Sequence, residues 1–169
     1  MFLDLVNQGR KDEERLKSDK VVFRRSAWHP AVLVGYATDA QSVLLGSLIV
    51  DGSIYPVPAG SKVLLSRAGW EQANLEARRG LALRFVKEVL LGFDEQLLDS
   101  APADFPKNAG KSTFRAPKVV STQTGGVQVE GWILEAPHSR GVTFRRSIYW
   151  FGNNGQLMRS YLADRLVVQ

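Results

Sequence analysis

The sequence has no cysteine and only two histidines among its 169 residues. A chain without cysteine cannot form a disulfide framework, a thiolate metal site or a cysteine nucleophile. The histidines, His29 and His138, are far apart in the sequence, and neither belongs to the His-Glu spacing of a metalloprotease. We therefore expect no metal ion and no cofactor.

A long apolar run without charge is also missing. The most apolar stretch, residues 31–50, contains Asp39 near its middle. An aspartate at the centre of a membrane helix costs about 2.5–3.5 kcal/mol, far more than each neighbouring Leu or Val gains. We interpret this stretch as a buried β-hairpin and expect no membrane span. Because Arg10 and Lys11 follow the first apolar residues, we expect no signal peptide, and a cytoplasmic or particle-associated location is the default.

The composition is that of a folded domain, with 44% hydrophobic and 23% charged residues. This much apolar surface excludes a wholly disordered chain. The formal net charge is +5, and it is unevenly distributed. Residues 107–169 carry nine basic and three acidic side chains, whereas residues 1–106 are close to neutral. The C-terminal third is therefore the predicted site for an acidic partner.

Residues 1–20 predict an amphipathic helical arm. Its apolar side chains form a narrow stripe made of Phe2, Leu5, Val6 and Leu16. A short isolated helix is only marginally stable in water. We therefore expect the arm to dock through this stripe, either on the rest of the chain or on a protein partner.

Residues 21–169 predict a single α+β domain. Residues 21–58 are rich in β-branched side chains and contain the turn signal Asp51-Gly52, which predicts a small antiparallel β meander whose last edge strand covers residues 54–58. Apolar residues at helical spacing predict one long amphipathic helix over residues 66–99. Between glycine-rich and proline-rich breaks, residues 118–168 predict a four-stranded antiparallel sheet.

Basic and aromatic residues alternate in the predicted strand over residues 143–151. Phe144 and Trp150 share one face, which we expect in the core, and Arg145 and Tyr149 share the other. We expect Arg145 and Tyr149 to lie on an exposed sheet surface that binds a protein partner, because Arg and Tyr are enriched in such interfaces. If the partner is instead a nucleic acid, we predict that it is bound by the cations Lys111, Arg115, Lys118, Arg140 and Arg145.

One motif suggests nucleotide chemistry, but its context excludes it. Gly110-Lys111-Ser112-Thr113 matches the end of a phosphate-binding loop. The full motif requires a glycine where Phe105 stands and a helix where Pro117 follows. No serine lies in a Gly-x-Ser-x-Gly elbow either. We expect a surface loop here and a chain without enzymatic activity.

The layout of a long helix followed by an antiparallel meander resembles two protein groups. The residues concerned lie on the helix (Ala82, Leu83, Phe85, Leu90 and Leu91) and around the last hairpin (Ile148 to Phe151 and Asn153 to Leu157). The groups are the nuclear-transport-factor-like domains and the inner-membrane assembly factors of conjugation and type IV secretion machines. The resemblance implies a cone-shaped sheet. The assembly factors also carry an N-terminal membrane span, for which residues 31–50 are a poor match.

Three hypotheses for the function follow. The leading one is a non-enzymatic structural or assembly subunit, as in a secretion, conjugation or phage-type assembly, that binds protein partners or further copies of itself. The second is a basic nucleic-acid-binding module that uses the C-terminal sheet. The third, implied by the resemblance, is a small-ligand pocket between helix and sheet, lined by Phe85, Val89 and Trp132.

Overall fold

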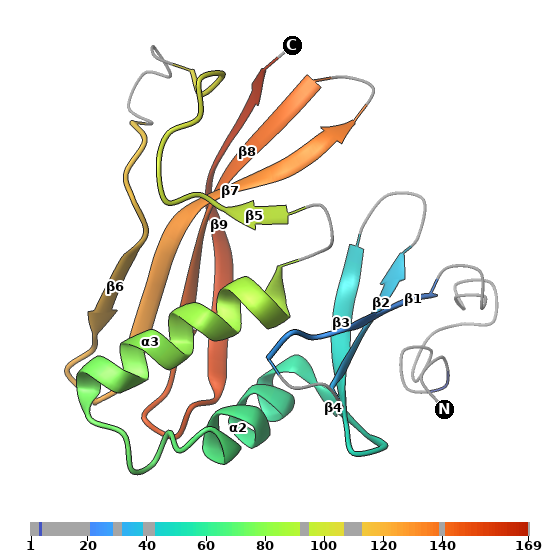
Figure 1. Ribbon diagram of the computed structural model, residues 1–169, viewed down its shortest axis with the longest axis vertical. Coiled ribbons are helices and arrows are strands. Elements are labelled where there is room, and N and C mark those ends of the chain that lie inside the picture. The colour runs from blue at the N-terminus through green and yellow to red at the C-terminus, as the bar shows by residue number, and fades with distance from the viewer. Residues whose placement is uncertain are drawn as a thin grey trace.

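The computed structural model describes residues 4, 21–28, 32–38, 43–91, 95–106, 113–138 and 141–168. Within this part of the chain, two antiparallel sheets flank a pair of helices (Figure 1). The predicted α+β class, with a β meander before the helical region and an antiparallel sheet after it, is confirmed. Apart from Asp4, the predicted arm over residues 1–20 lies outside the described residues.

The N-terminal sheet is a four-stranded meander in the order β1-β2-β3-β4. Its strands are β1 (Val21–Arg25), β2 (Leu33–Thr38), β3 (Val43–Val50) and β4 (Ser53–Pro56). A two-residue turn joins β3 to β4, with Asp51 at φ 48° and Gly52 at φ 76°. Asp-Gly is favoured in such a turn because both central residues need a positive φ. Strands β2 and β3 form the hairpin that we predicted within residues 31–50.

The helical region differs from the prediction of one helix over residues 66–99. Helix α2 (Val57–Arg67) begins directly after β4, with a proline in its first turn, where the missing N–H costs no helical hydrogen bond. The edge strand predicted up to residue 58 was therefore wrong beyond Pro56. After α2 the chain passes through Gly69 at φ 85°, a left-handed conformation that favours glycine and that ends the helix.

The second helix, α3 (Leu75–Phe85), is capped by Asn74, whose Oδ1 accepts a hydrogen bond from the Ala77 N–H at 2.9 Å. It continues as the π-helical turn η3 (Val86–Leu90), in which the Leu91 N–H donates to the Val86 carbonyl at 3.1 Å. At Leu91 the backbone becomes extended, with ψ 140°. The predicted helix is therefore too long at its C-terminal end, and a short strand follows instead.

The C-terminal sheet contains five strands, and its order is β5-β7-β8-β9, with β6 paired to the same edge of β7 as β5. The strands are β5 (Glu95–Leu97), β6 (Lys118–Ser121), β7 (Val127–His138), β8 (Gly141–Phe151) and β9 (Leu157–Val168). The four predicted strands are confirmed as β6 to β9. The sequence pattern missed β5, because its three residues looked like the end of a helix.

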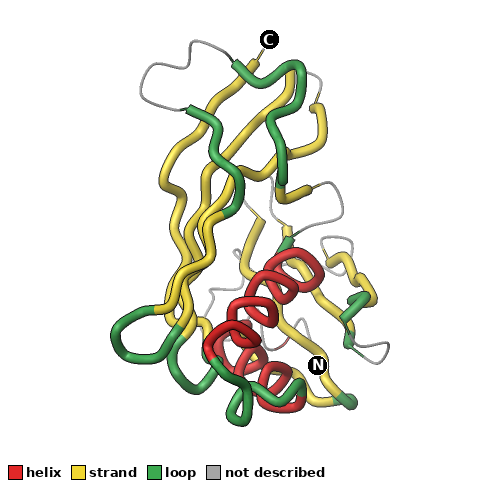
Figure 2. Tube along the Cα trace, turned by 60° about the vertical axis from the view of Figure 1, so that its left-hand side comes forward, coloured by secondary structure: helices red, strands yellow, loops and turns green. Residues whose placement is uncertain are grey.

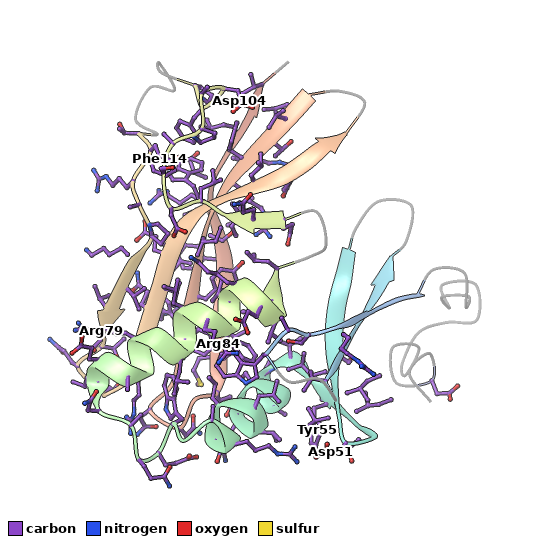
Figure 3. The ribbon with its side chains drawn as sticks, in the orientation of Figure 1. Asp51, Tyr55, Arg79, Arg84, Asp104 and Phe114 are labelled. Carbon is purple, nitrogen blue, oxygen red and sulfur yellow. The ribbon has the colours of Figure 1, made fainter. Side chains whose placement is uncertain are left out.

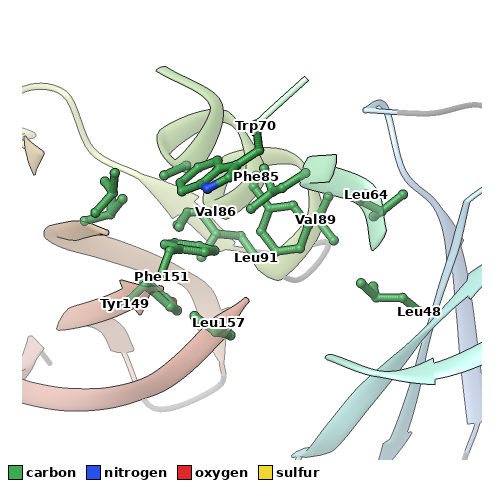
Figure 4. Close-up of a cluster of buried hydrophobic side chains, with 14 of the residues drawn as sticks. Leu48, Leu64, Trp70, Phe85, Val86, Val89, Leu91, Tyr149, Phe151 and Leu157 are labelled. Atoms are coloured by element: carbon green, nitrogen blue, oxygen red, sulfur yellow. The ribbon is translucent and has the colours of Figure 1, made fainter. Parts of the chain in front are cut away.

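Both faces of this sheet are covered. On one face, which we call the helix side, Trp70, Phe85, Val86 and Val89 pack against side chains of β7, β8 and β9 (Figure 4). The same cluster reaches Leu48 of the N-terminal sheet, so that one continuous core joins the two sheets through the helices.

On the opposite face, which we call the loop side, the segment after β5 covers the sheet. Phe105 packs with its ring centroid 5.1 Å from both Trp132 and Phe144. Phe114 adds a further ring 5.3 Å from Phe105 (Figure 3). The helices lie beside one half of the long strands, and this loop covers the other half (Figure 2). Each face is therefore covered over part of its length, and these covered parts are closed to a partner.

Candidate interaction surface

Arg145 lies in β8 on the helix side of the sheet, among carboxylates. Its Nη2 is 2.6 Å from Oε1 of Glu95, and its Nε is 3.0 Å from Oε1 of Glu135. Its Nη1 donates a hydrogen bond to Oγ of Ser147 at 2.7 Å. Only 21% of the Arg145 side chain is exposed. These contacts neutralise the charge within the fold, so that Arg145 presents little of it to a partner.

Tyr149 lies beside Arg145 and is 7% exposed. Burial raises the pKa of the Tyr149 hydroxyl, and the neighbouring Arg145 offsets part of this increase. For Arg145, burial alone would lower the pKa, but Tyr149 and Glu95 raise it above its ordinary value. Both groups therefore keep their usual protonation states at neutral pH, and together they form a polar layer inside the helix side of the sheet.

The predicted assignment of faces in β8 is correct in its alternation, but the two environments differ from those we expected. Tyr149 belongs to the buried helix-side core, together with Phe151. Phe144 is buried on the loop side, as predicted, but Trp150 is only half-buried. The prediction overlooked that covering loops and helices bury both faces of β8. The ring of Tyr149 is therefore not exposed for stacking against a partner.

The other predicted site residues are spread over the molecule. Phe2, Leu5, Val6 and Leu16 of the arm, and the cations Lys111 and Arg140, lie outside the described residues. Arg115 and Lys118 are exposed. Other cations are paired within the fold: Arg146 contacts Glu130 at 2.6 Å, and Arg84 lies 4.6 Å from the centre of the Trp28 ring (Figure 3).

The residues that we predicted to line a ligand pocket do not come together. Phe85 and Val89 are fully buried in the helix-side core. Trp132, which is 1% exposed, belongs to the loop-side core. The prediction was wrong because Trp132 and the helix lie on opposite faces of β7. No common pocket is formed by these three side chains.

The feature that sequence reasoning missed is the outer edge of β9. Among the described residues, β9 (12 residues) pairs with no strand other than β8. At the start of its outer edge, the Leu157 N–H donates to Oγ of Ser61 in α2 at 2.7 Å, so the edge without a partner strand begins at Met158. Such an edge presents a row of backbone N–H and C=O groups to any further strand. The other edge strands of the described residues are much shorter: β1 has five residues, β4 four, β5 three and β6 four.

Large apolar side chains are exposed along this same strand. Met158, Tyr161, Leu162 and Val167 are 64%, 46%, 54% and 57% exposed. Leu75, at the start of α3, is the one other large hydrophobic residue that is exposed among those described. We call Met158, Tyr161, Leu162 and Val167, with the unpaired backbone between them, the β9 edge. Exposed apolar side chains gathered on one strand are typical of an interaction surface.

The two arginines of β9 are more exposed than the two arginines of β8. The guanidinium of Arg159 lies 3.6 Å from the centre of the Trp150 ring. Arg165 is 57% exposed and contacts Glu135 at 3.5 Å. A signal for this edge is present in the sequence, since residues 157–168 contain neither proline nor lysine, two residues that commonly block edge strands.

Among the described residues, no group of three or more potential metal ligands lies together. None of the helices in that part of the chain combines the length and the apolar character needed to cross a membrane.

Comparisons with protein-family models, with curated proteins and with solved structures found no significant match to this chain. The proposal below therefore rests on the geometry of the sheet and its β9 edge.

Proposed function

We propose that this chain is a structural or assembly subunit that binds a protein partner by strand addition at the β9 edge. The observation that carries the proposal is the outer edge of β9 from Met158 onward, which has no partner strand among the described residues and has four exposed large hydrophobic side chains. In strand addition, backbone hydrogen bonds supply affinity, and pockets or contacts for alternate side chains supply specificity. The β9 edge offers both the backbone groups and the apolar contacts.

The burial of the rest of the sheet supports this choice of surface. Helices cover part of one face, and the loop after β5 covers part of the other. Arg145 and Arg146 of β8 each contact a carboxylate at 2.6 Å, so they add little to an outward positive field. Among the described strands of the C-terminal third, β9 is the one that combines an edge without a partner strand with exposed large apolar side chains.

A charge placed on the β9 edge tests the proposal. Leu162→Lys adds a strongly hydrated group at a position that is 54% exposed, so we expect the fold to be kept and binding to be lost. Leu75→Lys is the matched control, because Leu75 is 47% exposed and lies on α3. The wild-type chain and both variants are tagged and purified from the source cells. The proteins that co-purify with each tagged chain are then compared.

We expect wild type and Leu75→Lys to retain the same partner, another protein or an untagged copy, in a fixed ratio to the tagged chain. Leu162→Lys should lose it. The thermal unfolding transitions of the three proteins should agree within a few degrees, which excludes a folding defect. If Leu162→Lys retains the partner unchanged, or if wild type retains none, binding at the β9 edge is contradicted.

A basic nucleic-acid-binding module is the second candidate, favoured by the exposed side chains of Arg115 and Lys118. Its test is the affinity for a labelled single-stranded oligonucleotide between 50 and 200 mM salt, where a protein that binds several phosphates loses affinity steeply. Replacing both residues by Gln should then reduce the slope of the salt dependence by about one unit for each cation that no longer binds a phosphate. Absence of binding at low salt contradicts this candidate.

A further inference from the structure

We infer that the partner at the β9 edge is a second copy of this chain, paired antiparallel about a twofold axis at Tyr161. The inference rests on the proposed function and names its partner. Two identical strands can always pair antiparallel, because a twofold axis perpendicular to the sheet relates them. The question is whether the side chains of β9 match themselves in some register, and one register does.

Strand β9 contains irregularities that determine which of its residues share a face. Opposite β8, Trp150 pairs with Arg159, Ile148 with Tyr161, Ser147 with Leu162 and Arg146 with Asp164. Residues directly opposite each other lie on the same face, so Arg159, Tyr161 and Asp164 share the loop side. Between Leu162 and Asp164, the extra residue Ala163 forms a bulge.

This bulge makes the spacing on the two sides of Tyr161 equal. Arg159 lies two paired positions before Tyr161, and Asp164 lies two paired positions after it, because Ala163 is left out of the ladder. A twofold axis at Tyr161 therefore places Arg159 of each copy opposite Asp164 of the other, on the same face. Opposite charges in directly facing positions stabilise a pair of strands.

Other registers lack this match. An axis at Arg159, Asp164 or Arg165 places two like charges against each other, which is unfavourable in facing positions. An axis at Leu162 places Arg159 opposite Leu166, and one at Ser160 places Arg159 opposite Tyr161. Of the registers centred within 159–165, the one centred on Tyr161 is the one that forms ion pairs, and it forms two.

The same register also covers apolar surface. At the axis, the two Tyr161 rings, each 46% exposed, face each other. On the helix side, Leu162 of each copy, 54% exposed, lies opposite Ser160 of the other. The paired edges then join the two C-terminal sheets into one, so that each copy pairs backbone groups beyond Leu157 that have no partner strand among the described residues of a single copy.

The absence of native cysteine allows a direct test by single-cysteine cross-linking. In an antiparallel pair, facing Cα atoms lie about 4.5–5.5 Å apart, within the range of a disulfide. The residue on the twofold axis faces the same residue of the other copy. On oxidation, Tyr161→Cys should therefore form a disulfide-linked dimer in high yield. Leu75→Cys is the control, with 47% exposure against 46% for Tyr161, and should stay monomeric.

A charge exchange tests the register without cysteine. The mass of the wild-type protein in solution, measured by light scattering over a range of concentrations, should approach that of two chains. Arg159→Glu should raise the dissociation constant by about 10-fold, because two ion pairs become repulsive. Adding Asp164→Arg should restore most of the affinity, whereas Asp164→Arg alone should weaken the dimer like Arg159→Glu.

The outcomes separate this inference from the proposed function. A wild-type protein that stays monomeric at all concentrations, or a dimer that oxidised Tyr161→Cys does not trap, overturns the inference. In that case the comparison of Leu162→Lys with Leu75→Lys still decides whether a different protein binds the β9 edge. If the wild-type protein is monomeric and Leu162→Lys still retains the same partner as wild type, both the inference and the proposed function are contradicted.

Discussion

Strands β8 and β9 lie side by side in one sheet and have nearly equal lengths of 11 and 12 residues, but they differ in what they expose. No residue of β8 is exposed, whereas β9 exposes every residue from Met158 to Leu162. Both strands mix arginines with apolar residues. The difference teaches that the place of a strand in the sheet, more than its composition, decides whether its side chains stabilise the fold or are available to a partner.

The pair Arg145 and Arg165 shows this at one site. The two residues face each other across β8 and β9, and both contact the carboxylate of Glu135. Arg145 is 21% exposed and has Glu95 as a second partner, whereas Arg165 is 57% exposed and its contact is longer, at 3.5 Å. The same residue type therefore belongs to the interior in one strand and to the surface in the next.

The largest expected effect is that of removing an aromatic ring from β8. Phe144 is fully buried, with its ring 5.1 Å from that of Phe105, so Phe144→Ala should lower the free energy of unfolding by about 3–5 kcal/mol. Met158→Ala in β9, at a position 64% exposed, should change it by less than about 0.5 kcal/mol. Urea unfolding at low protein concentration measures both. Equal losses would show that the two strands do not differ in this way.

The two arginines on Glu135 should differ next. Arg145→Met leaves the carboxylates of Glu95 and Glu135 without their shared cation in a poorly solvated place, and we expect a loss of about 2–3 kcal/mol. Arg165→Met removes a solvent-screened contact and should cost about 0.2–1 kcal/mol. Adding Glu95→Gln to Arg145→Met should recover part of the loss. A double-mutant cycle by chemical unfolding gives these values, and no recovery would argue against repulsion as the cause.

A smaller effect is expected from the stacked pair of Arg159 and Trp150. Arg159→Ala removes a guanidinium 3.6 Å from the ring centre and should lower stability by about 0.5–1 kcal/mol. Arg159→Lys should recover only part of it, since the ammonium group lacks the planar stacking surface. Thermal unfolding at low concentration measures the change, with Ser160→Ala as the neighbouring control. A loss from Ser160→Ala as large as that from Arg159→Ala would indicate a general effect on the strand.

The smallest effect is a pH dependence that resides in β8. The pKa of Tyr149 is higher in the folded chain than the ordinary value near 10, because burial disfavours the phenolate. The unfolded chain therefore releases this proton first, so the contribution of Tyr149 is complete below pH 10 and is lost as the pH rises through the folded pKa. Tyr149→Phe should flatten the fall in stability above pH 10. Unfolding curves between pH 8 and 11 that keep the same slope in both proteins would contradict this.

Much of the C-terminal sheet follows from local sequence. Alternation in residues 127–168, with turns at Gly125 and at residues 152–155, predicts strands that match β7, β8 and β9 closely. These signals are local, because side chains alternate along a strand and tight turns require particular residues. The bounds of the helices were harder to predict from the sequence. Pro56 and Pro58 are typical of an edge strand as well as of a helix start, and only packing against the N-terminal sheet distinguishes the two.

The candidate site was predictable only in part, for a related reason. The sequence identifies Arg145 and Tyr149 as one face of a strand, and that is correct. It contains no local signal for the helices and the loop that cover both faces of β8, because these contacts join residues far apart in the chain. The β9 edge has the weak signal of a strand without proline or lysine, which is meaningful only once the strand is known to be an edge.

The sequence by itself determined that this is an α+β chain without cysteine chemistry, with a basic C-terminal third folded as antiparallel strands. The tertiary structure decided where that charge and the open backbone lie. Because β5 and β6 occupy the outer edge of β7, and β8 fills the other, β9 has no second partner strand in the part of the chain that the structure describes. Side-chain pattern is a local property, whereas the identity of the edge strand depends on the order in which all strands pair. That order places the available surface on β9.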